Sequence, residues 1–166
     1  MPRVQAQAVM LVHGHRHPHV LLLRDAQQTY HLPRVLLKPG EDEIHALRAY
    51  LSTALAPSPP ADRAVDHAAA PKAADDAWEV GELLATWWRP TAMAPLVPYV
   101  PAHVTKPVEK VRMYLIMLPP RKALSAPPGG ALVAVGLHDI TPAYGPEIVA
   151  LPALLSRFDL VCQGTN

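Results

Sequence analysis

Two apolar runs near the start of the chain predict a β-hairpin. Val9–Val12 and Val20–Leu23 are each continuous and apolar, as in buried strands, and they predict strands over residues 5–13 and 19–24. Gly14 and Pro18 lie between the runs and favour a turn. Similar patterns predict further strands at residues 29–32, 78–88, 111–118 and 132–137.

Apolar residues spaced three and four positions apart predict a helix after residue 40. Pro39-Gly40 interrupts the chain, and Glu41–Glu43 then place acids in a first helical turn, where the helix dipole favours them. One apolar face follows, formed by Ile44, Leu47, Leu51 and Leu55, and the helix ends before Pro57. Pro146 suits the first turn of a last helix that runs to about Phe158. Strands with two helices packed outside them predict an α/β layered fold.

Length and composition predict one domain with an irregular insertion. The 166 residues suit a single domain over 1–166, and half of them are hydrophobic. Residues 56–76 are mostly Ala, Pro and Asp, which predicts a solvated or disordered insertion, and residues 90–107 form a Pro-rich loop. The net charge of +1 gives no footprint for tight, sequence-independent nucleic-acid binding. Any RNA contact is therefore expected to be local or helped by a partner.

The single cysteine, Cys162, excludes a disulfide within the chain and a zinc site built on thiolates. This usage fits a reducing compartment. No apolar run approaches the roughly 20 residues of a membrane span, and the first residues lack the features of a signal peptide. We therefore expect a soluble intracellular protein that does not bind a membrane.

Four stretches of the chain together resemble one family. They are residues 12–23, residues 37–43, Trp87–Pro90 with Tyr99–Pro107, and Tyr144–Pro146 with Leu151–Phe158. In this order they are similar to the small Nudix subunit of mRNA cleavage factor Im, also called cleavage and polyadenylation specificity factor subunit 5. The resemblance implies a Nudix α/β/α sandwich with a mixed sheet and a homodimer with a large RRM-containing subunit. It also implies binding of UGUA-like pre-mRNA elements during 3′-end processing in the nucleus.

The resemblance raises the question of hydrolysis, because a working Nudix helix carries G-x5-E-x7-R-E-U-x-E-E-x-G-U, where U is bulky and apolar. Its carboxylates bind Mg²⁺, which stabilises charge as water attacks a pyrophosphate. With Glu41 aligned to the first glutamate, Val35 occupies the first glycine position. The Arg-Glu and Glu-Glu pairs are replaced by Ala49-Tyr50 and Thr53-Ala54. We therefore predict a protein that is not an enzyme and holds no metal or cofactor.

Two alternatives to a non-catalytic subunit stay open at this level. One is a degenerate hydrolase with a displaced metal site, but Asp42 and Glu43 lie about two helical turns from the missing ligands. The simpler interpretation of Glu41–Glu43 is charge at a helix start. The other alternative is a nucleotide sensor whose old cleft binds without cleaving.

The RNA-contact positions implied by the resemblance are partly changed in this chain. Tyr30 matches an aromatic that stacks on bases, although it would equally serve as a half-buried residue closing the sheet. Thr29 replaces a second aromatic, Gln28 a threonine and Gln7 a glutamate. Further matching contact positions are Leu32, Tyr144 and Gly145. The first strand begins close to Met1, whereas relatives carry a longer segment before it with two base-reading side chains, so weak or altered UGUA binding is expected.

The resemblance also implies a surface for the large subunit. Tyr99 and Leu154 match positions that contact its RRM, and Val97 replaces a second tyrosine of that contact. Packing within the Pro-rich loop is the alternative role for Tyr99.

Two other patterns have competing interpretations. His13, His15, His17 and His19 alternate, so on a strand they would share one side and could bind a metal, or simply form a polar hairpin tip. Trp87 and Trp88 should face opposite sides of a strand. One is then expected in the core and the other at the surface, where it would pack or stack on a base.

Overall fold

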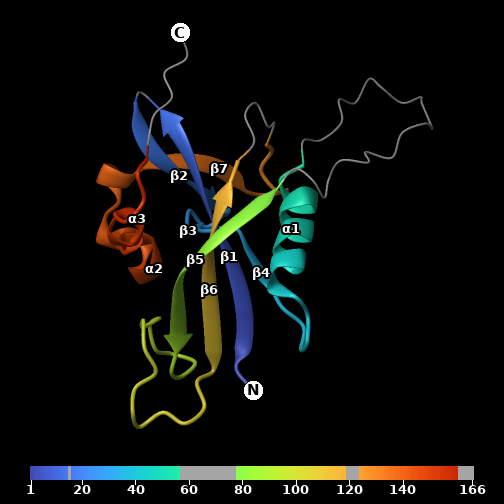
Figure 1. Cartoon of the computed structure of the whole chain (residues 1–166), viewed down its shortest axis with the longest axis vertical. Coiled ribbons are helices and arrows are strands. Elements are labelled where there is room, and N and C mark those ends of the chain that lie inside the picture. The colour runs from blue at the N-terminus through green and yellow to red at the C-terminus, as the bar shows by residue number, and fades with distance from the viewer. Residues whose placement is uncertain (15, 57–77, 119–123, 161–166) are drawn as a thin grey trace, which may run out of the picture.

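The computed structural model describes residues 1–14, 16–56, 78–118 and 124–160 (Figure 1). The strands are β1 (Arg3–Gly14), β2 (His17–Arg24), β3 (Tyr30–His31), β4 (Arg34–Leu36), β5 (Glu79–Arg89), β6 (Glu109–Met117) and β7 (Ala131–Gly136). The helices are α1 (Glu43–Ala54), α2 (Pro146–Val149) and α3 (Leu151–Leu155), with 3₁₀ turns at Leu137–Asp139 and Pro142–Tyr144. The predicted insertion at 56–76 lies almost wholly outside these residues.

A mixed sheet forms the centre of the molecule, and β1 is its longest strand. The strand order is β3-β2-β1-β6-β5, with β4 also paired to β1 and β7 to β2. The β1–β6 pair is parallel, whereas the other pairs are antiparallel. The predicted hairpin is confirmed, since Leu11 pairs with Val20 and Gly14 with His17.

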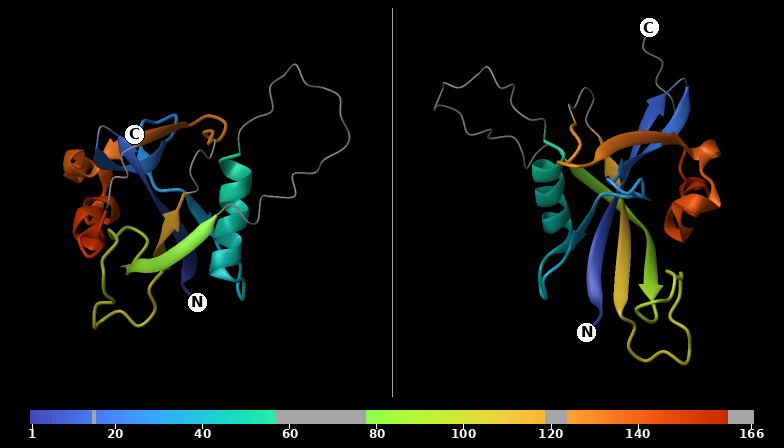
Figure 2. Two further views of the ribbon diagram at one scale, coloured as in Figure 1. Left: turned by 45° about the horizontal axis from the view of Figure 1, so that its top comes forward. Right: turned by 180° about the vertical axis from the view of Figure 1, so that it is seen from behind.

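Helices cover both faces of the sheet, which confirms the α/β/α sandwich. Helix α1 lies on one side, and α2 and α3 lie on the other (Figures 1 and 2). Alternation along β1 explains the two layers, because Ala6, Ala8 and Met10 pack towards α1 whereas Val9 packs towards α3. Fully buried leucines pack against each face of the sheet. They are Leu47, Leu51 and Leu55 on the α1 side and Leu151 and Leu155 on the other side.

Two local features differ from the predicted elements. Strand β4 was not predicted, because its three residues show no apolar pattern and the strand forms only by pairing with β1. The predicted last helix is divided into α2 and α3 at Ala150, since Pro152, the second residue of α3, has no N–H to donate to the preceding turn. The tryptophans behave as predicted: Trp87 is buried, and Trp88 is half-buried with the Lys110 ammonium 5.3 Å from its ring centre.

Candidate functional site

Tyr30 and Tyr144 are far apart in the sequence but touch in the structure. Tyr30 begins the short strand β3, and Tyr144 ends the 3₁₀ turn before α2. Their rings meet edge to face with centroids 5.0 Å apart and an interplanar angle of 63°. Both rings are half-buried against the core on the α3 side of the sheet. Gly145 follows with φ +103°, a conformation that L side chains rarely adopt, so the backbone beside the rings carries no side chain of its own.

The turn before Tyr30 is held by a single carboxylate. Asp25 accepts from the backbone N–H groups of Gln27 and Thr29, each at 2.9 Å. This arrangement places Gln28 in the left-handed region with φ +63°. Gln28 and Thr29 are therefore exposed beside Tyr30, and five predicted RNA positions gather in one place: Gln28, Thr29, Tyr30, Tyr144 and Gly145.

The side chains of two other predicted RNA positions are buried. Leu32 is 1% exposed and belongs to the core on the same side of the sheet as Tyr30. Gln7 is 3% exposed, because β1 is an inner strand between β4 and β6, and its Oε1 has no hydrogen-bond partner. The burial of both side chains results from the order of the strands in the sheet, which cannot be seen from their positions in the sequence.

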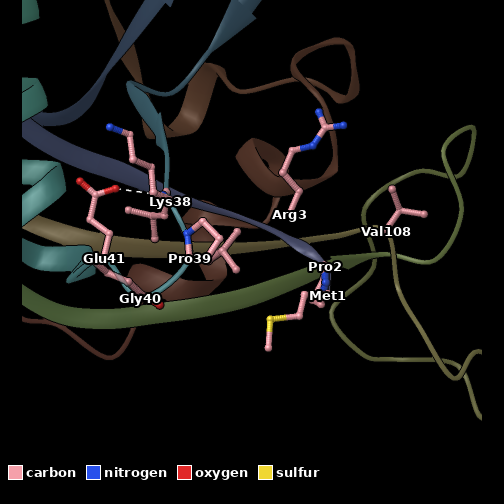
Figure 3. Close-up of a pocket in the computed structure, with 11 residues that line it drawn as sticks. Met1, Pro2, Arg3, Lys38, Pro39, Gly40, Glu41 and Val108 are labelled. Atoms are coloured by element: carbon pink, nitrogen blue, oxygen red, sulfur yellow. Dashed lines mark hydrogen bonds between the residues drawn. The ribbon is translucent and has the colours of Figure 1, made fainter.

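The acids at the start of α1 hold the helix and its loop in place. Asp42 is the N-cap, and its Oδ1 accepts from the His45 backbone N–H at 2.7 Å. Glu41 accepts from the Lys38 backbone N–H at 2.9 Å, as Figure 3 shows. The simpler interpretation of Glu41 and Asp42, charge at a helix start, therefore accounts for both contacts.

Glu43, the first residue of α1, joins the helix to the sheet. Its carboxylate forms an ion pair with Arg112 at 3.0 Å and accepts a hydrogen bond from the Tyr114 hydroxyl. Burial and this hydrogen bond raise the pKa of Tyr114 to about 12. Arg112 and Tyr114 were not singled out in the sequence, although their alternate spacing on a strand puts both on the face below α1.

The α1 positions that were aligned with the Arg-Glu and Glu-Glu pairs of the Nudix pattern carry neutral side chains. Ala49 and Thr53 are exposed on α1, and Thr53 donates to the Ala49 carbonyl at 2.9 Å. Tyr50 is half-buried, and burial raises the pKa of its phenol. In the part of the chain that the structure describes, no cluster of three or more His, Cys, Asp or Glu side chains is arranged to hold a metal.

A hollow of about 680 Å³ lies next to this helix start (Figure 3). It is lined by the first residues of β1 and the loop before α1, including Arg3, Lys38, Glu41 and Glu43. Both of its carboxylates already bond within the protein, Glu41 to the Lys38 backbone and Glu43 to Arg112. The hollow therefore offers no unengaged pair of acids for a metal.

The predicted partner positions lie on α3 and on the loop between β5 and β6. Val97 pairs with Trp88 through two backbone hydrogen bonds, of 2.7 and 2.8 Å, and is half-buried. Tyr99 lies two residues further along the same loop and is 62% exposed, so the loop does not bury its ring. Leu154 is half-buried on α3, and this helix shares a core with Leu96 of the loop.

Three of the alternating histidines, His13, His17 and His19, lie in the β1–β2 hairpin. His15 lies outside the described residues. His19 contacts the His17 carbonyl, with Nδ1 2.9 Å from the oxygen. The His17 ring meets the His138 ring edge to face, with centroids 5.3 Å apart. These contacts link the hairpin to the segment after β7.

Comparison with known proteins first defines the class. A family model described as nucleotide hydrolase, of the Nudix type, matches residues 1–158. A C. elegans Ap4A hydrolase in a binary complex has a TM-score of 0.58 and 15% identity, covering 94% of this chain and 99% of its own. The M. smegmatis Nudix hydrolase RenU has a TM-score of 0.58 and 13% identity, covering 96% and 89%. At such low identity these structures establish the Nudix fold alone.

Curated sequences define the family within that class. The cleavage and polyadenylation specificity factor subunit 5 of Dictyostelium discoideum is 35% identical over 96% of this chain and 75% of its own length. The pre-mRNA cleavage factor Im 25 kDa subunit 2 of Arabidopsis thaliana is 37% identical over 94% and 74%. The chain belongs to this family of cleavage factor Im small subunits. The relatives are named as cleavage factor subunits, whereas the matching fold neighbours are named as hydrolases.

No helix among the described residues is long and apolar enough to cross a membrane.

Proposed function

We propose that this chain is a non-catalytic, RNA-binding subunit of the nuclear machinery that cleaves and polyadenylates pre-mRNA. Its named relatives support a role in mRNA 3′-end processing. The RNA role is carried by one observation, the contact between Tyr30 and Tyr144 beside the bare backbone of Gly145. Single-stranded RNA is typically bound by stacking unpaired bases on such aromatic rings.

The position of the two rings suits base stacking, because the rings pack against the core but are not fully buried. Both residues pack against the core and are half-buried. The edge-to-face contact and the packing against the core hold both rings in place, so little side-chain entropy is lost when a base binds. Gln28 and Thr29 supply exposed polar groups next to the rings.

The structure of α1 supports the loss of catalysis. Mg²⁺-dependent hydrolysis requires several carboxylate oxygens around one ion. On α1, Glu43 is already bound to Arg112 and Tyr114, and the helix positions beyond it carry Ala49, Tyr50, Thr53 and Ala54. We expect no turnover of nucleoside di- or polyphosphates by the purified chain with Mg²⁺. Phosphate release that a chelator abolishes, and that survives repurification, would show that the chain is a hydrolase.

Assembly is part of the proposal. The chain would act as a homodimer that holds a large RRM-containing subunit through Val97, Tyr99 and Leu154. An exposed tyrosine on an ordered loop is a common anchor at protein interfaces. The RRM would add RNA contacts to those of the Tyr30–Tyr144 site.

The decisive experiment compares RNA binding by ring variants. Binding of the wild-type chain to a UGUA oligonucleotide and to a scrambled one is followed by fluorescence anisotropy, with NMR titration for weak complexes. Tyr30→Leu keeps apolar volume but removes the ring, and we expect affinity to fall by roughly 1–3 kcal/mol. Tyr30→Phe should bind nearly as well as wild type, and Tyr99→Leu is the matched control away from the site. If Tyr30→Leu binds as well as wild type, the RNA site lies elsewhere.

A further inference from the structure

A carboxylate lies against Gly145, the glycine that follows Tyr144. Glu147 is the second residue of α2, and its side chain turns back over Gly145. A methyl group built on Gly145 would lie 3.4 Å from Glu147 Oε2 and 3.7 Å from Oε1, so both oxygens sit directly over this glycine. Gly145 follows Tyr144, whose ring contacts Tyr30. The acid therefore lies against the backbone that follows Tyr144.

The oxygens of Glu147 are available to a ligand. None of the ion pairs or side-chain hydrogen bonds found among the described residues uses Glu147, and the residue is partly exposed. In contrast, Glu43 and Glu109 each hold an arginine, Arg112 and Arg89 respectively. Because Gly145 has no side chain, that residue does not block access of a ligand to the Glu147 carboxylate.

The chemistry of a carboxylate restricts which base it binds. An ionised carboxylate only accepts hydrogen bonds, and its two oxygens match two neighbouring N–H donors. Guanine presents such a pair on its Watson–Crick edge, N1–H and the 2-amino group. Adenine, cytosine and uracil each place a single donor beside an acceptor on that edge, and the acceptor would be repelled.

We propose that Glu147 selects guanine for the Tyr30–Tyr144 site. This inference rests on the proposed RNA-binding function and names the base that the site prefers. A base that stacks on the rings would direct its Watson–Crick edge to Glu147 across the backbone of Gly145. A bidentate pair of this kind discriminates between bases by roughly 5- to 150-fold.

The test is a double-mutant cycle between one residue and one base. Glu147→Gln keeps the size of the side chain but replaces an acceptor by a donor. Inosine in place of the single guanine of UGUA removes only the 2-amino donor. We expect wild type to lose several-fold in affinity for the inosine oligonucleotide and the Glu147→Gln chain to lose less. The two changes are thus coupled, as expected of groups in contact. Glu79→Gln, an exposed acid on β5, is the matched control and should behave as wild type.

The outcomes distinguish a failure of guanine selection by Glu147 from a failure of the proposed RNA-binding function. If Tyr30→Leu weakens binding while Glu147→Gln and inosine act additively, RNA binding stands and guanine selection by Glu147 is overturned. If Tyr30→Leu has no effect, the proposed function itself fails at this site. Absence of RNA-dependent NMR shifts at millimolar concentration overturns both. Circular dichroism of each variant confirms that the comparison is made between folded chains.

Discussion

The bond between Tyr114 and Glu43 makes a testable prediction about stability in alkali. Tyr114 is 7% exposed, its ring packs in the core below α1, and its hydroxyl donates to Glu43. Tyr114→Phe keeps the ring packing but removes the hydroxyl and its titration. At pH 7 we expect the variant to lose about 1.5 kcal/mol of unfolding free energy, the lower end for a hydrogen bond to a charged group. The lower end applies because Glu43 still holds Arg112.

The pH dependence follows from the direction of the pKa shift. Burial, and then the hydrogen bond to Glu43, raises the pKa of Tyr114 from 10.0 to about 12. The folded chain therefore holds the phenol proton more tightly than the unfolded chain. The resulting stabilisation is fully present below pH 10 and is lost as the pH rises from 10 through 12. Two pKa units correspond to about 2.7 kcal/mol at most. Solvent near the hydroxyl, whose partner Glu43 is 21% exposed, reduces this to about 1–2 kcal/mol.

Urea unfolding at pH 8, 9, 10, 11 and 11.5 measures the effect. The stability difference between wild type and Tyr114→Phe should be nearly constant up to pH 10 and then shrink towards zero. Lysines and the other tyrosines also titrate in this range, but they do so in both chains and cancel in the difference. Tyr99→Phe, at an exposed position, should show no such change. A difference that stays constant from pH 8 to 11.5 would refute the reasoning.

Three further predictions concern the assembly of the protein and the cap of α1. Tyr99→Ala should weaken capture of an RRM-containing large subunit in pull-downs without lowering the melting temperature. Met93→Ala, a control at a 95% exposed position in the same loop, should leave capture unchanged. Equal capture by both variants would show that the contact lies elsewhere. Light scattering at micromolar concentration should give the mass of a dimer, and a strictly monomeric mass would contradict the proposed assembly. Asp42→Ala should cost about 1 kcal/mol in urea unfolding because the His45 N–H loses its cap, and Asp42→Asn should restore most of it.

The local elements of this protein could be predicted from its amino-acid sequence. Periodic apolar residues predicted α1 and the β1–β2 hairpin, because amphipathic spacing and turn residues act over a few positions. The prediction that Tyr50, Thr53 and Ala54 replace Nudix carboxylates also needed only the linear pattern, because these residues follow Glu41 at fixed spacing. Resemblance in short motifs then led to the right fold class and family.

The tertiary structure alone decided which of these residues meet. The order of the strands buried Gln7 and Leu32, created β4 against β1, and carried Glu43 to Arg112 and Tyr114. It also joined Tyr30 to Tyr144 across more than a hundred residues and set Glu147 over Gly145. The physical reason is that burial and side-chain contact depend on strand register and on how helices pack against the sheet. These are properties of the whole assembled core, which no local pattern of hydrophobic and polar residues specifies.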